Sequence, residues 1–384
     1  MYTERTKHIA PRDIMKGFHS IIIEGLFTSS FFIITGAMWG SVFLIAFLRK
    51  LNASELQIGI LSALPQVASM FQILASYLIE KYGHRKAFCI ISSFLGKFFW
   101  LIFIFIPLVV PATVPQLRIW LSLLFVFLAN VSLFFSNTSY ISWVSDFVPD
   151  RIRGTLFAKK TIISSVVILF MPFLLGKYFD YFQRLEYYTL IFSGGVILGF
   201  IGTFFLIRIP SVPMTLEKYS RIWDIIKTPF QDKNFRTYLL FNLLWSSSLM
   251  LMVPFVQIYL LEGLGCSKTY VGFLLVLNGI ANILFTWVWG YLSDKFSRKP
   301  FVIICASFIL FTPLIWIIVT PHNYRFILVV LYFVAGIFWA GLNITIFTLL
   351  MGLVPEKGKS KYYANFYITV GIGGAIAPVL GGYL

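Results

Sequence analysis

Two short charged turns contain the residues whose chemistry could control the movement of one helix against another. The stronger turn, residues 290–299, lies between two long apolar runs and places one acid, Asp294, before three basic residues. A weaker copy lies 214 residues earlier, in residues 76–85, with Glu80 as its acid. A carboxylate at one helix end can face the N-terminus of another helix, which carries partial positive charge. We therefore expect a gating latch made by Glu80, Arg85, Asp294, Arg298 and Lys299.

A second pair of segments repeats at nearly the same interval. Residues 148–158 recur as residues 354–364, which lie 206 positions later. Unequal loops between corresponding elements explain the small difference between the two intervals. The chain is therefore predicted to contain two copies of one structural unit.

The composition excludes an ordinary soluble protein. Hydrophobic residues make up 59% of the chain and charged residues only 12%, whereas about a quarter of the residues in soluble domains are charged. Many apolar runs exceed about 18 residues, the length that crosses a bilayer. The net charge of +16 lies in the loops between these runs, which argues against a nucleic-acid partner. The three cysteines are scattered without metal-ligand spacing, and we predict neither a metal site nor a cofactor.

The apolar runs predict an all-α polytopic membrane protein with eleven spans. Residues 1–207 are expected to form a six-helix half, in which an interfacial helix over residues 12–29 leads into the first span. Residues 208–234 form a linker with an amphipathic surface helix, and residues 235–384 hold five more spans. The repeat predicts six and six, so a twelfth helix is expected to be missing, the alternative being a protein with an odd number of spans. The expected spans are 25–48, 56–79, 87–110, 118–142, 159–180, 187–207, 236–261, 269–292, 300–320, 325–350 and 361–384.

Basic residues predict which side of the membrane each loop faces. The N-terminal tail, the linker and the loops after even-numbered spans carry 23 of the 31 Lys and Arg residues, and the opposite loops carry 7. Loops rich in Lys and Arg stay in the cytoplasm. The N-terminus and both charged turns are therefore expected on the cytoplasmic side of the inner or plasma membrane.

The charged turn at residues 290–299, placed after the second span of a six-span half, resembles the loop signature of the major facilitator superfamily. The copy at residues 76–85 departs from this signature at Ser76, Glu80 and His84, but it keeps an acid and a basic cluster. The resemblance covers the chain apart from the missing last span. It implies a fold of two pseudo-symmetric six-helix halves and solute transport by alternating access between them.

In the fold that this resemblance implies, each acid of the latch would face a helix start in the other half. Glu80 would lie near residues 360–361, at the start of the eleventh span. Asp294 would lie near residues 154–155, at the start of the fifth span. The alternative is that the turns serve only as topology signals, which is less favoured because the acids recur together with the bases.

Polar residues within the spans gather in the first, fourth, seventh and tenth, which line the central cavity in the superfamily's fold. A polar side chain in lipid must find a partner, so these residues are expected to face protein or a water-filled path. Hydrogen bonding between helices is an equal alternative for any one of them, although the set as a whole favours a cavity. The candidates are Thr35, Trp39, Asn130, Asn137, Asn242, Trp245, Gln257, Trp339 and Asn343.

Lys97 is the one Lys or Arg residue assigned to no loop, because it lies deep inside a predicted span. We expect it roughly 15 Å into the third span, half way across a core of about 30 Å. A charge there costs about 2.5–3.5 kcal/mol, and the side-chain oxygens of Asn130 and Gln72 are the expected partners, since Glu24 and Asp146 are expected to be too shallow. A structural pin between spans two, three and four is favoured over a proton carrier.

The function predicted from these features is that of a secondary-active or facilitative transporter. No carboxylate is expected at midplane depth, so the substrate is predicted to be a small neutral or amphipathic molecule, such as a sugar-like solute. Coupling to a co-transported proton and passive transport both stay open, and we expect a monomer in the lipid bilayer. A non-transporting receptor or scaffold of the same fold is the first alternative. A membrane-embedded enzyme is less favoured, because no HExxH motif or Ser-His-Asp set is present and no catalytic residue is predicted.

Overall fold

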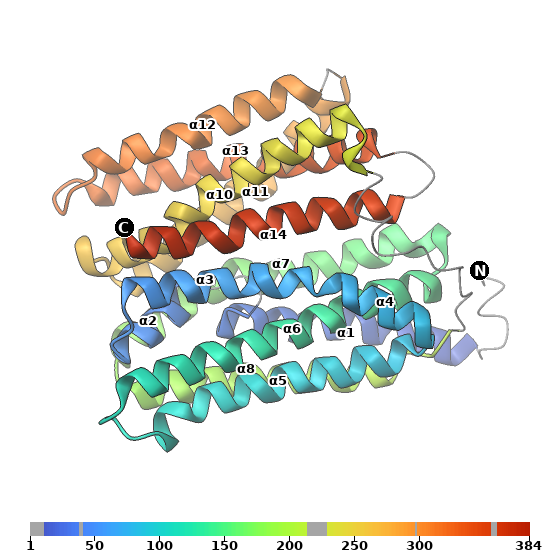
Figure 1. The fold of residues 1–384 in the computed structure, drawn as a ribbon, viewed down its shortest axis with the longest axis horizontal. Helices are drawn as coiled ribbons and strands as arrows, with labels where there is room; N and C mark the ends of the chain where they lie inside the picture. The colour runs from blue at the N-terminus through green and yellow to red at the C-terminus, as the bar shows by residue number, and fades with distance from the viewer. Residues whose placement is uncertain (1–10, 38–40, 213–228, 296–297, 355–358) are drawn as a thin grey trace.

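The computed structural model describes residues 11–37, 41–212, 229–295, 298–354 and 359–384. These residues form long helices joined by short connections (Figure 1). The helices are α1 (Pro11–Thr35), α2 (Val42–Lys50), α3 (Glu55–Met70), α4 (Gln72–Tyr82), α5 (Arg85–Val109), α6 (Pro115–Phe147), α7 (Asp150–Tyr181), α8 (Leu185–Ile207), α10 (Lys233–Ile258), the π-helical turn η2 (Tyr259–Gly263), α11 (Lys268–Lys295), α12 (Arg298–Ile318), α13 (Tyr324–Leu353) and α14 (Lys359–Tyr383).

Eleven helical segments of the described chain are long and apolar enough to cross a membrane. The expectation of an all-α polytopic protein is therefore confirmed. The amphipathic helix expected in the linker falls largely on residues 213–228, which lie outside the described residues.

The prediction of an interfacial helix before the first span is wrong. Residues 11–35 form the single helix α1, which is itself long enough to cross a membrane. The polar positions of α1 include Ser20 and Glu24, which are buried inside the first half. A helix with one polar face suits a membrane surface, but it equally suits a span whose polar face packs against other helices.

The first span is also interrupted near its far end. Gly36 adopts a left-handed backbone conformation with φ of 73°, which a glycine tolerates at no steric cost. The chain then restarts as α2, whose N-cap Ser41 accepts a hydrogen bond from the backbone N–H of Leu44 at 3.1 Å. The expected span over residues 25–48 is therefore two helices, α1 and α2, joined by a break.

The helices run alternately in opposite directions, so their ends gather on two sides (Figure 1). We call the side where α1 begins the tail side. The distal side holds the connections 51–54, 110–114, 182–184, 264–267 and 319–323.

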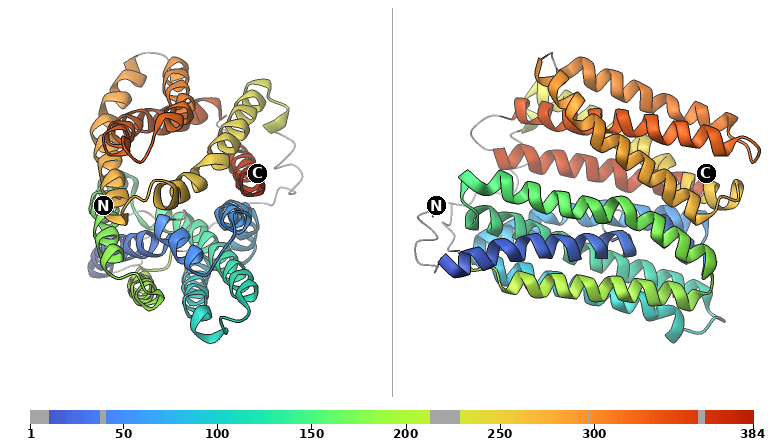
Figure 2. Two further views of the ribbon diagram at one scale, coloured as in Figure 1. Left: turned by 90° about the vertical axis from the view of Figure 1, so that its left-hand side faces the viewer. Right: turned by 180° about the vertical axis from the view of Figure 1, so that it is seen from behind.

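The helices pack into two groups that use corresponding pairs. In the first group α5 lies against α6 and α8, and α1 lies against α7 and α8. In the second group α11 and α12 lie against α13, and α10 lies against α14. Figure 2 shows the two groups on either side of a boundary, with α1–α8 in blue to green and α10–α14 in yellow to red.

The two groups meet mainly along two pairs of helices, α3 with α14 and α7 with α11. Small residues allow the helix backbones to approach closely at these contacts. A Cβ atom added to Gly59 of α3 would lie 2.2 Å from the carbonyl oxygen of Pro378 in α14. A Cβ atom added to Gly176 of α7 would lie 2.3 Å from the carbonyl oxygen of Lys268 at the start of α11. Both contacts lie toward the distal side, so the halves are tightly joined there.

Substitution of Gly59 by alanine tests this close contact. We expect Gly59→Ala to destabilise the protein, because overpacking a tight contact costs about 1–3 kcal/mol. The control is Gly194→Ala in α8, where an added Cβ atom would meet nothing within 4 Å. This control should be neutral or more stable by up to about 1 kcal/mol, from helix propensity alone. The measurement is the midpoint of thermal unfolding, and equal midpoints for the two variants would contradict the packing of α3 on α14.

Candidate functional site

A cavity of about 230 Å³ lies at the boundary between the two groups, and we call it the central cavity. The first group contributes the start of α2 together with α3 and α6, and the second group contributes α10. Its polar lining consists of amide and hydroxyl side chains, and no ionisable side chain is among its described lining residues. These polar residues are Ser41, Ser62, Gln66, Asn130 and Gln257.

The break between α1 and α2 shapes one wall of this cavity. Thr35 ends α1 and donates its hydroxyl hydrogen to the carbonyl oxygen of Phe31 at 2.7 Å. The same hydroxyl oxygen accepts from the backbone N–H of Ala37 at 3.2 Å. Gly36, Ser41 and Val42 then line the cavity, so the interrupted backbone and the start of α2 face the cavity where an unbroken helix would present only side chains.

Gln257 has an unsatisfied acceptor at the opposite wall. Its Oε1 atom is buried and has no hydrogen-bond partner among the described residues. Buried polar atoms without a partner cost free energy, so this oxygen is suited to accept a hydrogen bond from a solute. Gln257 follows Pro254 in α10 and lies two residues before the π-helical turn η2. Such turns frequently mark functional positions in helices.

A second cavity, of about 170 Å³, lies within the first group, and we call it the first-half cavity. Three acidic or basic side chains line it: Glu24 of α1, Lys97 of α5 and Lys160 of α7. Lys160 Nζ donates to Glu24 Oε2 at 2.8 Å and to the hydroxyl oxygen of Tyr140 at 2.8 Å. Glu24 Oε1 accepts a hydrogen bond from Thr28 at 2.8 Å. This buried ion pair therefore has both carboxylate oxygens satisfied.

The depth of Glu24 differs from the expectation that it lies near the end of its span. Because α1 begins at Pro11, Glu24 is at the middle of the helix, roughly 20 Å from its start at 1.5 Å per residue. Lys160 lies roughly 15 Å from the start of α7. The prediction that no carboxylate reaches this depth is therefore wrong, because it placed the start of the first span too late in the sequence.

Lys97 is 2% exposed, in agreement with its predicted burial, but its partners are not the expected ones. Its Nζ donates to Ser93 Oγ at 2.6 Å and to Thr203 Oγ1 at 2.5 Å, and it lies 5.8 Å from the ring centre of Phe31. The contacts therefore join α5 to α8 and α1, and not to the second and fourth spans. The face of α5 that carries Lys97 also carries Ser93 one turn earlier, and this face lies against α8.

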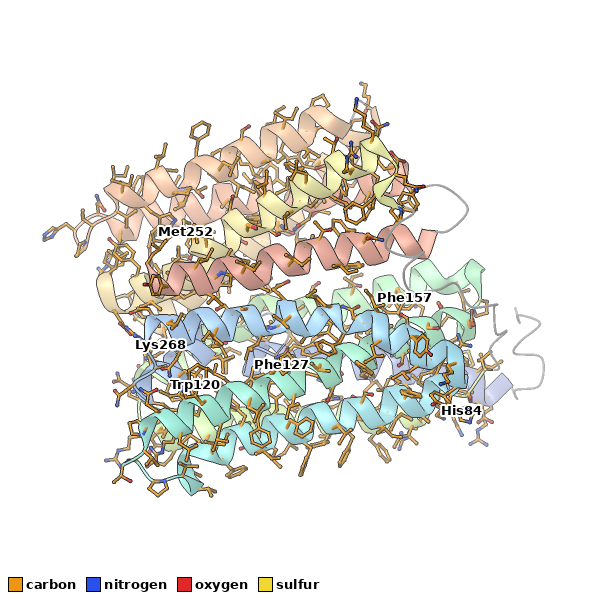
Figure 3. All side chains as sticks on the ribbon, in the orientation of Figure 1. His84, Trp120, Phe127, Phe157, Met252 and Lys268 are labelled. Carbon is orange, nitrogen blue, oxygen red and sulfur yellow. The ribbon has the colours of Figure 1, made fainter. Side chains whose placement is uncertain are left out.

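The distal side is closed by an ion pair and by helix-end hydrogen bonds that the sequence did not predict. Arg49, at the end of α2, donates from Nε to Glu262 Oε1 at 2.6 Å and from Nη2 to Glu262 Oε2. Asp180, near the end of α7, accepts from the backbone N–H groups of Lys268 and Thr269, each at 2.8 Å. Both contacts cross the boundary, and the second places a carboxylate at the N-terminus of α11, where helix partial charge favours it. Figure 3 labels Lys268 at this distal end of the boundary.

Sequence and structure comparisons point to one family. Residues 237–384 match the model of the Major Facilitator Superfamily. The structure superposes on that of the nucleoside transporter NupG with a TM-score of 0.68 at 15% identity, over 97% of this chain and 90% of that one.

The resemblance to the major facilitator superfamily is confirmed.

Two further solved structures share the superfamily fold. A bacterial homologue of the iron transporter ferroportin in an inward-facing state has a TM-score of 0.68 at 13% identity, over 97% of this chain and 92% of that one. A D-xylose-proton symporter has a TM-score of 0.64 at 14% identity, over 95% of this chain and 90% of that one. At these identities the likeness concerns the fold alone.

Curated relatives match only part of the chain. A Na(+), Li(+), K(+)/H(+) antiporter of Planococcus maritimus is 26% identical over 159 residues, which are 40% of this chain and 36% of that protein. The multi-drug resistance efflux pump PmrA of Streptococcus pneumoniae is 29% identical over 147 residues, which are 37% of this chain and 36% of that protein. The matches therefore span about a third of the length of these relatives.

The structure distributes the predicted cavity residues over several places in the superfamily fold. Asn130 and Gln257 line the central cavity, next to the break that follows Thr35. Asn137 lines the first-half cavity instead. Trp39 lies outside the described residues.

The remaining candidates of the second half do not line either cavity. Trp245 and Trp339 pack edge to face, with ring centres 6.4 Å apart, in an apolar cluster with α12. Asn242 is buried and donates to the carbonyl oxygen of Tyr238 at 2.8 Å in its own helix. Asn343 is exposed on α13. Packing and helix-internal hydrogen bonds account for the first three of these side chains.

One member of the predicted latch is described in full. Arg85 is buried and donates from Nη1 to Asp146 Oδ2 at 2.7 Å and to the carbonyl oxygen of Ser142 at 2.8 Å. These contacts join α5 to α6 within the first half. The side chains of the other members lie outside the described residues, so the latch stays a prediction for Glu80, Asp294, Arg298 and Lys299.

Loss of the Glu262 carboxylate tests the distal closure. We expect Glu262→Gln to raise the population of a distal-open form by up to about fivefold, since partly exposed ion pairs contribute about 0.2–1 kcal/mol. The measurement is the distance distribution between spin labels on the distal ends of α2 and α10. Glu55→Gln is the control, because Glu55 lies 3.1 Å from Arg49 but belongs to the same half. A Glu262→Gln distribution identical to that of the control would refute this role for the Arg49–Glu262 pair.

Paired substitutions test the buried ion pair. Glu24→Gln and Lys160→Met should each destabilise the protein by about 3–5 kcal/mol, because each leaves a buried charge without its partner. The double variant should recover much of that loss, since it removes both charges. Thermal unfolding measures all three, with Lys159→Met, an exposed neighbour, as the control. Additive losses in the double variant would contradict a coupled pair.

Proposed function

We propose that the protein transports a small, neutral, polar solute by alternating access at the central cavity. The proposed moving bodies are residues 1–207 and 235–384, connected by the linker 208–234. The observation that carries this proposal is the position of the central cavity, which lies between the two helix groups below a closed distal side. Release of the distal contacts would let the halves separate on that side and expose the same cavity to the other side.

The proposed orientation places the tail side in the cytoplasm of a bacterial-type inner membrane or a plasma membrane. Its support is the excess of Lys and Arg in the tail, in the linker and in the tail-side loops. With this orientation the structure represents a form closed toward the outside. We also propose that a single chain suffices, because the central cavity is bounded by residues of this one chain.

The lining of the central cavity supports a neutral substrate. Burying an ionised solute without an opposite charge is costly, and amide and hydroxyl groups line this cavity. The free Oε1 of Gln257 favours a solute that carries hydroxyl or N–H donors. Among proteins of the same fold, one is named as a nucleoside transporter and another as a D-xylose-proton symporter. Both names are compatible with a solute of this class.

A co-transported proton is the proposed coupling partner. The support is the Glu24–Lys160 pair, in which protonation of the carboxylate would release the ammonium group from its partner. Two similar proteins are named for proton-coupled transport, one as an H(+) antiporter and one as a proton symporter. We propose no enzymatic reaction, since the two cavities suit binding and passage of a solute rather than a chemical step.

Uptake into proteoliposomes tests the proposal. The probes are labelled pentoses and nucleosides, with a lipophilic cation for comparison. We expect the wild type to accumulate or equilibrate a neutral probe, and Gln257→Leu and Asn130→Leu to weaken its transport about tenfold, through loss of a hydrogen bond in a dry site. Gln231→Leu is the matched control, because Gln231 is exposed and lines neither cavity.

The outcomes separate the competing functions. Binding of a neutral probe without flux across the membrane would favour the receptor or scaffold. Transport of the cation alone would contradict the substrate class while supporting a transporter. Equal flux in the Gln257→Leu, Asn130→Leu and Gln231→Leu variants would contradict the central cavity as the substrate site.

A further inference from the structure

The charges that line the first-half cavity do not balance. Glu24, Lys97 and Lys160 all line it, so one carboxylate faces two ammonium groups. Glu24 is fully used, because Oε1 accepts from Thr28 and Oε2 accepts from Lys160. Among the described residues no carboxylate lies within ion-pair distance of Lys97. The cavity therefore carries a surplus of one positive charge.

Some hydrogen-bond donors in this cavity are also not used by the described contacts. An ammonium group has three N–H donors, and the described contacts use two of Lys97 and two of Lys160. The side-chain amide of Asn137 lines the same cavity and has no hydrogen-bond partner among the described residues. These three groups come from α5, α7 and α6 and converge on one space of about 170 Å³.

A buried ammonium group with only hydroxyl partners is costly in a membrane protein. Hydroxyl oxygens orient the charge of Lys97 but do not neutralise it, and the aromatic ring of Phe31 adds only a weak attraction. Buried charges in proteins are normally paired with an opposite charge. A negative charge would balance the surplus in the first-half cavity. The unused hydrogen-bond donors define where this negative charge would lie.

We propose that the first-half cavity is a binding site for a small monoanion of the carboxylate class, held by Lys97, Lys160 and Asn137. The anion would accept charge-assisted hydrogen bonds from both lysines and one bond from the asparagine amide. Glu24 remains paired with Lys160 on the other side and excludes a second anion by repulsion. The site is distinct from the neutral central cavity. It therefore holds a second ligand, or a charged ligand of the transport cycle that the central cavity does not bind.

Thermal unfolding of the purified full chain with acetate as the probe tests the site. The reference buffer contains gluconate, a much bulkier carboxylate than acetate, and acetamide serves as the neutral isostere of acetate. We expect acetate, and not acetamide, to raise the unfolding midpoint with saturation. Lys97→Gln should raise the half-saturating acetate concentration roughly tenfold or more, which is the loss of one charge-assisted hydrogen bond. Lys86→Gln, on the same helix but hydrogen-bonded to the carbonyl oxygen of Ile207, should behave as the wild type.

A second variant supplies the negative charge from the protein itself. Asn137→Asp places a carboxylate where the anion would lie and changes the side chain very little in size. We expect this variant to unfold at a higher temperature than the wild type in gluconate and to lose the response to acetate. Without a surplus positive charge, a new buried carboxylate would instead lower the midpoint.

Three outcomes would overturn the site. They are the same response of the wild type to acetate and acetamide, an unchanged acetate response in Lys97→Gln, and a lower unfolding midpoint for Asn137→Asp in gluconate. None of these results depends on solute uptake at the central cavity, so the two proposals can fail separately.

Discussion

The burial of polar groups inside the first half governs much of this structure. Lipid offers no hydrogen bonds, so each polar side chain in a span must find its partner in protein or in a polar cavity. Glu24 meets this requirement through Lys160 and Thr28, and the Nη1 group of Arg85 meets it through Asp146. These pairs join α1 to α7 and α5 to α6, so the chemistry that satisfies the charges also sets which helices are neighbours in this half.

The interactions at the boundary between the halves differ from those inside the first half. Close backbone approach at glycines joins α3 to α14 and α7 to α11. The Arg49–Glu262 ion pair and the hydrogen bonds from the start of α11 to Asp180 lie at the distal end of the same boundary. A partly exposed ion pair and a carboxylate at a helix N-terminus are each individually weak contacts. A closure made of several weak contacts suits the proposed transport cycle, in which the halves separate and rejoin. The buried pairs within the first half break less easily.

The central cavity and the first-half cavity differ in the charge of the side chains that line them. The central cavity is lined by amides and hydroxyls and lies where the two halves meet. The first-half cavity is charged and lies among helices of one half. The two cavities are connected by α1, whose middle carries Glu24 and whose end at Thr35 leads into the central cavity. In the function that we propose, solute selection and charge coupling occur in these separate places.

The sequence alone determined the helices and most of their approximate ends, because hydropathy over about 20 residues is a local property. The superfamily fold was implied by the internal repeat together with the resemblance of residues 290–299 to the superfamily's loop signature. The sequence also placed Asn130 and Gln257 among the cavity candidates and Lys97 inside a span. Only the tertiary structure decided that Glu24 is paired at mid-helix, that Lys97 contacts α8, and that Trp245 and Trp339 pack in an apolar cluster. The polar face of α1 has the same pattern whether it meets a membrane surface or Lys160, and the residues that separate these cases lie more than a hundred positions away. Partner choice depends on helix rotation and neighbour order, which no local pattern encodes.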